Sequence, residues 1–211
     1  MNYDTLILFS VVSFFYIISP GPAIFLAIYN GAVNGVKCVS VSALGNILGL
    51  LILSALSISG LSAVLMASSS LFMAFKIVGA LYLIYLGIKQ IRASKEAKIE
   101  HPDEIVKSAR PLFSYFKEGL LVAVTNPKPI VFFAALFPQF LDTKSPLLMQ
   151  FSVMTLIFMA FSFLSLSTYG YLGRQAKEFL SGSHQTKWFH RISGGLFVGM
   201  GVSLFHVKSA S

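Results

Sequence analysis

The chain has 211 residues, of which 55% are hydrophobic and only 11% are charged. A soluble domain of this length carries about 25% charged residues, so the composition excludes an ordinary soluble protein. The net charge of +8 would suit a nucleic-acid-binding protein. However, the basic residues are concentrated in a few connections between long apolar segments, and we therefore expect no nucleic acid as a partner.

Six long apolar segments follow one another along the chain, and a helix needs about 20 such residues to cross the hydrocarbon layer. The predicted spans are residues 6–28, 39–66, 71–88, 113–140, 147–172 and 192–207. The third and fourth each hold a charge in their interior, Lys76 and Lys128. The first has no Lys or Arg before it and no cleavage site after it, so we interpret it as a retained helix and not as a signal peptide. The sequence therefore predicts an all-α integral membrane protein in which residues 1–211 form a single transmembrane domain.

The basic residues predict the orientation of these spans. Twelve of the 16 Lys and Arg residues lie in or beside the connections between spans 1 and 2, 3 and 4, and 5 and 6, which share one side of the membrane. The opposite side has only Lys144 and Lys208. By the positive-inside rule, the three basic connections face the cytoplasm and both termini lie outside. Residues 92–112 also include several acids and are predicted to be a solvated cytoplasmic loop.

Two similar proline-containing stretches occur 107 residues apart. The first is ISPGPAIFLAIYN (residues 18–30), and the second lies within TNPKPIVFFAALFPQF (residues 125–140). The same offset places span 1 on span 4 and span 2 on span 5. Because each half contains an odd number of crossings, the halves would lie upside down relative to one another, as in many secondary transporters. We therefore predict two inverted three-helix repeats, residues 1–91 and 113–211, in which helices 1 and 4 are broken.

Each Pro-x-Pro stretch is predicted to break its helix near the middle of the membrane, because proline removes a backbone donor and clashes with the preceding turn. Such breaks are tolerated only inside protein or beside a water-filled cavity. Two helix N-termini near the midplane favour an anion, and Lys128 adds a full positive charge. We therefore predict a central site for a ligand with a carboxylate, with walls around Phe25, Asn46 and Phe132. The predicted substrate-binding residues are Pro20, Gly21, Pro22, Asn46, Asn126, Pro127, Lys128 and Pro129.

Several of these features also have a purely structural explanation. The prolines are consistent with simple helix kinks, and Lys76, near the end of its span, could extend its amine to the interface. Pairs of glycines four residues apart are typical of close helix packing, and glycine-rich faces permit a homodimer without requiring one. These pairs are Gly31/Gly35, Gly45/Gly49 and Gly195/Gly199. Asn46 could either join two helices or line the path of a ligand, and the hydroxyl groups of residues 162–169 leave the same two alternatives open. For the serines among them, hydrogen bonds to carbonyls of their own helix are the favoured explanation.

Four stretches are distinctive in combination: SPGPAIFLAIYNGAVNGVK, ALGNILG, FKIVGALYLIYLGIKQIR and FKEGLLVAVTNPKPIVFFAALFPQFLD. Together with RISGGLFVGMGVSLF in span 6, they resemble the LysE/RhtB superfamily of bacterial amino-acid exporters, and most of all its homoserine/threonine-resistance branch. The resemblance implies a multi-pass protein of the bacterial inner membrane that exports amino acids or close relatives in exchange for protons. Many members have an acidic residue directly after Pro-Gly-Pro, where this chain has Ala23. Because every carboxylate lies in a tail, in a loop or at the end of a span, the candidate coupling groups are Lys128, Lys76 and Glu118.

The favoured hypothesis is an exporter of small neutral amino acids, such as homoserine, threonine or leucine, that works by alternating access with or without proton antiport. The alternatives are a facilitator or exporter of another small metabolite or cation without proton coupling, and a membrane subunit that transports nothing. A metal exporter would need Cys, His, Asp or Glu within the spans, and only Cys38 and His206 come near. An enzyme would need a nucleophile with a base or a metal, and no His or acid lies in a span core. We therefore expect no enzymatic activity, cofactor or metal, and we expect an amino-acid substrate and the lipid bilayer as partners.

Overall fold

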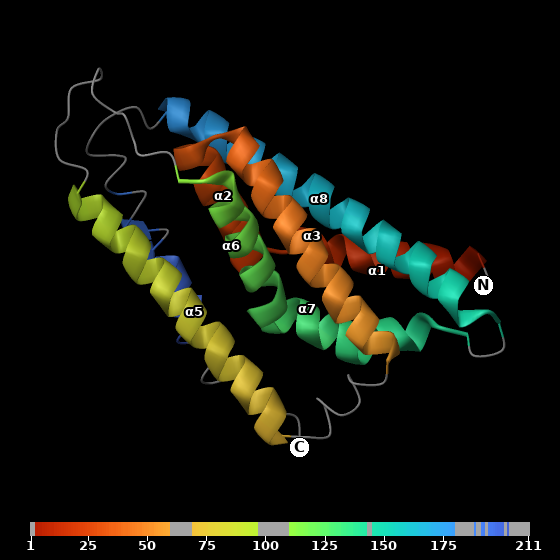
Figure 1. Cartoon of the computed structure of the whole chain (residues 1–211). Coiled ribbons are helices and arrows are strands. Elements are labelled where there is room, and N and C mark those ends of the chain that lie inside the picture. Colours follow the sequence, from red (N-terminus) through yellow and green to blue (C-terminus); the bar gives the residue numbers. More distant parts are fainter. Residues whose placement is uncertain are drawn as a thin grey trace.

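The computed structural model describes residues 3–59, 69–96, 110–142 and 145–179, together with residues 188, 191–192, 194–200 and 202. Within these residues the chain is helical apart from short connections, and no β-strand occurs (Figure 1). The helices are α1 (Tyr3–Ile18), α2 (Pro22–Asn34), α3 (Val36–Ile58), α5 (Ser69–Glu96), α6 (Leu112–Thr125), α7 (Pro127–Val131) and α8 (Leu147–Phe179). A π-helical turn, η1 (Phe132–Leu136), and a 3-10 turn, η2 (Phe137–Phe140), continue α7. The all-α prediction is confirmed for this part of the chain.

Both Pro-x-Pro stretches break a helix, as predicted. α1 ends at Ile18 and α2 begins at Pro22, with an angle of 55° between the two helices. α6 ends at Thr125, and the segment Pro127–Phe140 continues at an angle of 48° to it. Each new helix begins with a proline, where the missing N–H costs nothing because the first-turn donors have no helical acceptor.

One long unbroken helix borders each broken pair. α8 packs along both α1 and α2, while α3 packs along α6 and also contacts α7, η1 and η2. α3 and α8 run in opposite directions and pack against each other (Figure 1). This arrangement places both breaks beside the same two helices. The six-helix inverted repeat stays a prediction, because seven of the 16 residues of predicted span 6 lie outside the described residues.

Glycines allow these helices to pack backbone against backbone. A Cβ built on Gly45 of α3 would lie 2.0 Å from the carbonyl oxygen of Phe116 on α6. A Cβ on Gly31 of α2 would lie 1.8 Å from the carbonyl oxygen of Gly170 on α8. Neither position tolerates a side chain without moving a helix, so the close-packing explanation holds there and at Gly49, where a Cβ would lie 2.5 Å from the Cβ of Ala123.

The other predicted packing glycines make no such contacts within the described part of the chain. Gly35 lies between α2 and α3 with a φ of +88°, a conformation that favours glycine, and its role is to allow this turn. At Gly195 and Gly199, an added Cβ would meet no described atom within 4 Å. The prediction of close packing was therefore wrong for Gly35. For Gly195 and Gly199 it stays a prediction.

The long helices expose apolar side chains and bury polar ones. On α3, Leu44 and Leu48 are exposed, whereas Asn46 and Ser54 are buried. This pattern is the reverse of that in a soluble helix and is expected for a helix surrounded by lipid. α3 and residues 147–176 are each long and apolar enough to cross a membrane, and each broken pair would add one more span. The described residues thus contain two to four candidate spans.

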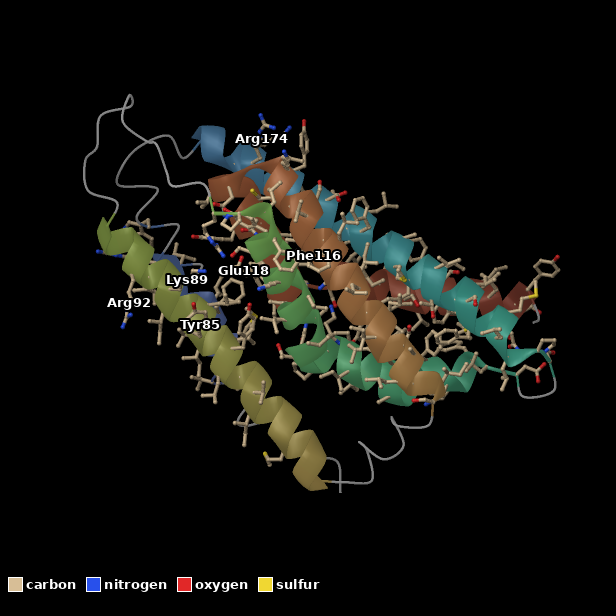
Figure 2. All side chains as sticks on the ribbon, in the orientation of Figure 1. Tyr85, Lys89, Arg92, Phe116, Glu118 and Arg174 are labelled. Carbon is tan, nitrogen blue, oxygen red and sulfur yellow. The ribbon has the colours of Figure 1, made fainter. Side chains whose placement is uncertain are left out.

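The described basic connections lie at the same end of the helix bundle. Figure 1 shows the α2–α3 junction, the C-terminal end of α5, the start of α6 and the last turns of α8 at one end of the bundle. The N-terminus, the end of α3 and the start of α8 lie at the opposite end. Lys89, Arg92 and Arg174 lie toward the first end (Figure 2). The described basic connections therefore share one side, as predicted, and the assignment of that side to the cytoplasm stays a prediction.

Candidate functional site

The two helix breaks lie against each other. The side-chain amine of Lys128, in the first turn of α7, donates hydrogen bonds to the carbonyl and hydroxyl oxygens of Ser19, each at 2.7 Å. The hydroxyl group of Tyr16 donates to the carbonyl oxygen of Lys128, and Lys128 Nζ lies 4.8 Å from the centre of the Tyr16 ring. The salt bridges found among the described residues do not include Lys128. Its charge is therefore held by a carbonyl, a hydroxyl group and an aromatic ring.

The N-terminal end of α2 is open, whereas that of α7 is capped. Gly21 precedes α2 and no side chain caps its first turn, which begins with Pro22. At α7, Asn126 Oδ1 accepts a hydrogen bond from the backbone N–H of Lys128 at 3.0 Å. The free N–H groups at a helix start favour an anion. Only one of the two predicted anion-attracting helix ends is therefore free, the one at the start of α2. Lys128 lies beside it, since a Cβ built on Gly21 would lie 3.9 Å from Lys128 Nζ.

A cavity of about 50 Å³ lies where the two breaks meet α3 and α8. This volume holds only a few water molecules, so a larger ligand requires its walls to move apart. Five of the eight predicted site residues line the cavity, namely Gly21, Asn46, Asn126, Lys128 and Pro129. Pro20, Pro22 and Pro127 do not line it, and their visible role is to set the positions of the breaks.

α3 and α8 form the remaining wall, which is partly polar. Ser162 Oγ donates a hydrogen bond to Asn46 Oδ1 at 3.3 Å, so Asn46 joins the two helices, the first of its two predicted roles. Asn46 also lines the cavity, and its role on the path of a ligand stays a prediction. Ser165 lies almost one turn further along α8, and its buried hydroxyl has no hydrogen-bond partner among the described residues. Leu50 and Phe158 lie one turn from Asn46 and Ser162 in the other direction and make this end of the cavity apolar.

The aromatic wall differs from the predicted one. Phe132 is fully buried in the apolar cluster around Phe158, and Phe25 packs on a different cluster, so neither lines the cavity. Tyr16 and Phe158 provide the aromatic surface instead. The sequence of a uniformly apolar helix does not show which of its faces is turned toward the cavity. The prediction therefore named the wrong phenylalanines.

The hydroxyl groups of residues 162–169 do not behave as predicted. Ser162 bonds to α3, and the hydroxyl group of Tyr169 donates to the carbonyl oxygen of Ile18 at 3.0 Å, across to the end of α1. The hydroxyl groups of Ser165 and Ser167 have no partner in the part of the chain that the structure describes. The prediction of bonds within the helix was therefore wrong for these three serines. Ser162 bonds to Asn46 instead, because Asn46 offers an acceptor on the neighbouring helix.

Glu118 is buried away from the cavity, with 8% of its surface exposed. Its Oε1 accepts hydrogen bonds from Lys89 Nζ on α5 at 3.0 Å and from Arg110 Nη2 at 2.7 Å; Figure 2 shows Glu118 on the side of α6 that faces α5. Burial lowers the pKa of Arg110, but the hydrogen bond and the negative charge of Glu118 outweigh it and hold the pKa above its ordinary value. Arg110 was predicted to lie in a solvated loop; it is instead tied to the bundle.

The remaining candidates give less information. The side chain of Lys76 lies outside the described residues. Among the described residues, no three His, Cys, Asp or Glu side chains gather where they could hold a metal ion.

The sequence matches the model of the LysE type translocator family over residues 14–208, which is nearly the whole chain. The chain belongs to this family. The translocator is 33% identical to the leucine efflux protein of Salmonella typhimurium (strain LT2) over 146 residues, which are 69% of this chain and 66% of that protein. It is 31% identical to the leucine efflux protein of Klebsiella pneumoniae over 173 residues, 78% of this chain and 79% of that protein. It is 29% identical to the homoserine/homoserine lactone efflux protein of Salmonella typhi over 210 residues, the full length of both chains.

The family membership confirms the resemblance drawn from the motifs. The chain is a multi-pass membrane protein of a translocator family. Its match spans just under two thirds of the length of the Salmonella leucine efflux protein. No solved structure gives a significant match to the translocator.

Proposed function

We propose that this translocator exports small neutral amino acids across the bacterial inner membrane, with the cavity at the two helix breaks as its substrate site. The observation that carries the proposal is Lys128, a cation inside the bundle that lines this cavity, lies beside the open start of α2 and forms no salt bridge among the described residues. An intramembrane charge is costly and marks a functional site by default. The names of the relatives, which include efflux proteins for leucine and for homoserine, support the substrate class.

In this proposal the substrate carboxylate takes the place of Ser19 beside the amine of Lys128. The carboxylate would accept a charge-assisted hydrogen bond from Lys128 and further bonds from the free first-turn N–H groups of α2. Because Lys128 and Ser19 now join the two breaks, binding would loosen this contact and let the walls of the small cavity separate. The movement of one broken pair relative to the other would then open the site to alternate sides, within two inverted three-helix repeats.

Proton coupling, if it drives export, requires a group on the substrate path that gains and loses a proton. Lys128 is the candidate that lines the cavity, whereas Glu118 is held by two cations away from it. Both termini are proposed to lie outside, with the basic connections in the cytoplasm.

Release of labelled amino acids from proteoliposomes tests the function. Vesicles that contain the purified translocator are loaded with leucine, homoserine, threonine or lysine. Release is followed with and without an inward proton gradient, in which the solution outside the vesicles is more acidic than the lumen. Release of the neutral amino acids but not of lysine is expected, and acceleration by the gradient would identify an antiporter. Release that ignores the gradient would identify a facilitator, and an absence of release for every amino acid would refute the proposal.

A further inference from the structure

The polar belt on α3 and α8, formed by Asn46, Ser162 and Ser165, has no role in binding a carboxylate at Lys128. We propose that this belt is the subsite for the α-ammonium group of the substrate, so that uncharged oxygen atoms recognise the amino group. This inference rests on the proposed function, because it assumes that an amino acid occupies the cavity.

An amino acid brings three N–H donors into the cavity with its ammonium group, and each needs an acceptor there. Leaving such donors unpaired in a buried site costs much of the binding free energy. No carboxylate is among the residues found to line the cavity. Asn126 is already engaged, since it caps α7. Ser19 is released when the carboxylate takes its place beside Lys128, and the other side-chain oxygens that can accept from the ammonium group are on α3 and α8.

The belt offers three oxygen atoms with free acceptor capacity. Ser165 Oγ is buried, with its residue 9% exposed, and has no hydrogen-bond partner among the described residues. Asn46 Oδ1 has two lone pairs and accepts one hydrogen bond, from Ser162. Ser162 Oγ is the donor in that bond, so its own lone pairs stay available. A buried hydroxyl without a partner is unusual in a native protein, and a bound ammonium group would satisfy Ser165.

The order of residues along the cavity places the belt between the carboxylate site and an apolar end. Leu50 and Phe158 belong to one apolar cluster, and Leu166 belongs to another together with Ile24 in the first turn of α2. The hydrogen bond from Ser162 to Asn46 lies between these two clusters along α8. Ser165 is the sequence neighbour of Leu166. The belt therefore lies next to the start of α2, where the carboxylate is proposed to bind.

This order matches the connectivity of an amino acid. The ammonium and carboxylate groups are attached to the same carbon, so their subsites must be adjacent, and the side chain must extend away from both. The apolar end of the cavity, at the buried side chains of Leu50 and Phe158, suits an apolar side chain once the walls of the small cavity have separated. A substrate with a second cationic group would find no carboxylate among the described lining residues.

Binding to the purified full-length protein, measured by isothermal titration calorimetry, tests the proposal. Leucine is compared with 4-methylpentanoate, which has the same carboxylate and side chain but no amino group, and homoserine is compared with 4-hydroxybutanoate. In Ser165→Ala, the affinity for the two amino acids should fall about tenfold, the usual effect of losing a hydrogen bond to a charged group. The affinity for the two amine-free acids should not change. The folded protein should tolerate the substitution because no partner of Ser165 is left unpaired.

Ser167→Ala is the matched control, because the Ser167 hydroxyl on α8 also has no partner in the described part of the chain and Ser167 does not line the cavity. This variant should bind all four compounds with wild-type affinity. An equal loss of affinity for amino acids and amine-free acids in Ser165→Ala would show that Ser165 contacts the carboxylate and would overturn the proposal, as would wild-type affinity for leucine and homoserine. A wild-type protein that binds neither amino acid contradicts the proposed function itself, which is a distinct result.

Discussion

Replacing Glu118 by glutamine is expected to lower the free energy of unfolding of the translocator by about 2 kcal/mol. Removing one partner of a fully buried ion pair costs about 3–5 kcal/mol, whereas an exposed pair contributes about 0–1 kcal/mol. The side chain of Glu118 is 11% exposed, but those of Lys89 and Arg110 are 41% and 35% exposed. Both cations can return to water when the acid is neutralised, so the cost falls between the two limits.

Thermal unfolding in detergent measures this cost. For a chain of this size about 1 kcal/mol corresponds to roughly 2–4 °C, so the midpoint should fall by about 4–8 °C. Lys89→Met and Glu118→Gln should together cost less than the sum of the single changes, because they remove the same contact. A Glu118→Gln variant with the wild-type midpoint would show that the ion pairs do not hold α5 and Arg110 to the bundle.

The pH dependence of the same measurement follows from Arg110. The pKa of Arg110 is raised in the folded protein. Its contribution to stability is therefore complete below the pKa of the same arginine in the unfolded chain, and is lost only as pH rises from there through the higher pKa of the folded state. In a Lys89→Met background, where Arg110 is the remaining partner, the cost of Glu118→Gln should therefore be the same at neutral pH and near pH 10. A cost that disappears on the alkaline side would mean that Arg110 is not the partner that matters.

Two further substitutions, one of them with a control, test contacts between the helices. Gly119→Ala would place a Cβ 1.9 Å from the backbone oxygen of Ser42 and should cost at least about 1–3 kcal/mol on thermal unfolding. In the control, Gly195→Ala, the added Cβ meets no described atom within 4 Å, so the midpoint should not fall. Equal midpoints for the two variants would argue against close contact of α3 and α6. Tyr169→Phe removes the hydrogen bond to the carbonyl oxygen of Ile18, so stability should fall by about 1 kcal/mol and amide exchange around the α1–α2 break should become faster. Unchanged exchange there would mean that Tyr169 does not hold the end of α1.

The breaks and the cation could be predicted from the sequence because each depends on local chemistry. Proline cannot donate a backbone hydrogen bond, so a proline within an apolar run predicts a helix start there. Pro22 and Pro127 are indeed the first residues of α2 and α7. Lys128 stands out for the same reason, since a charge within a span has few structural explanations. The 107-residue offset between the two stretches then made it reasonable to expect them in one site, and the structure brings Lys128 and Ser19 into contact.

The walls of the cavity could not be predicted, because they depend on how each helix is rotated. Lipid and protein interior are both apolar, so a membrane helix has no polar face to mark its exposed side, and Phe158 cannot be told from Phe25 or Phe132 by pattern. Ser165 was expected to bond to its own helix, because a hydroxyl in a helix usually bonds to the backbone there. Its place in the cavity wall was therefore missed. The capping of α7 by Asn126 was also missed, although Asn before Pro is a typical N-cap sequence.

Substrate binding and release by Lys128→Gln test the central claim, that the cation at the two breaks binds the substrate carboxylate. Lys117→Gln is the control, because Lys117 is exposed on α6 and lies over the ring of Phe113, away from the cavity. The account predicts that Lys128→Gln binds leucine or homoserine at least about tenfold more weakly and no longer releases them from proteoliposomes, although it is expressed and inserted into the membrane as the wild type is. Lys117→Gln should behave as the wild type. Release by Lys128→Gln at the wild-type rate would contradict the account.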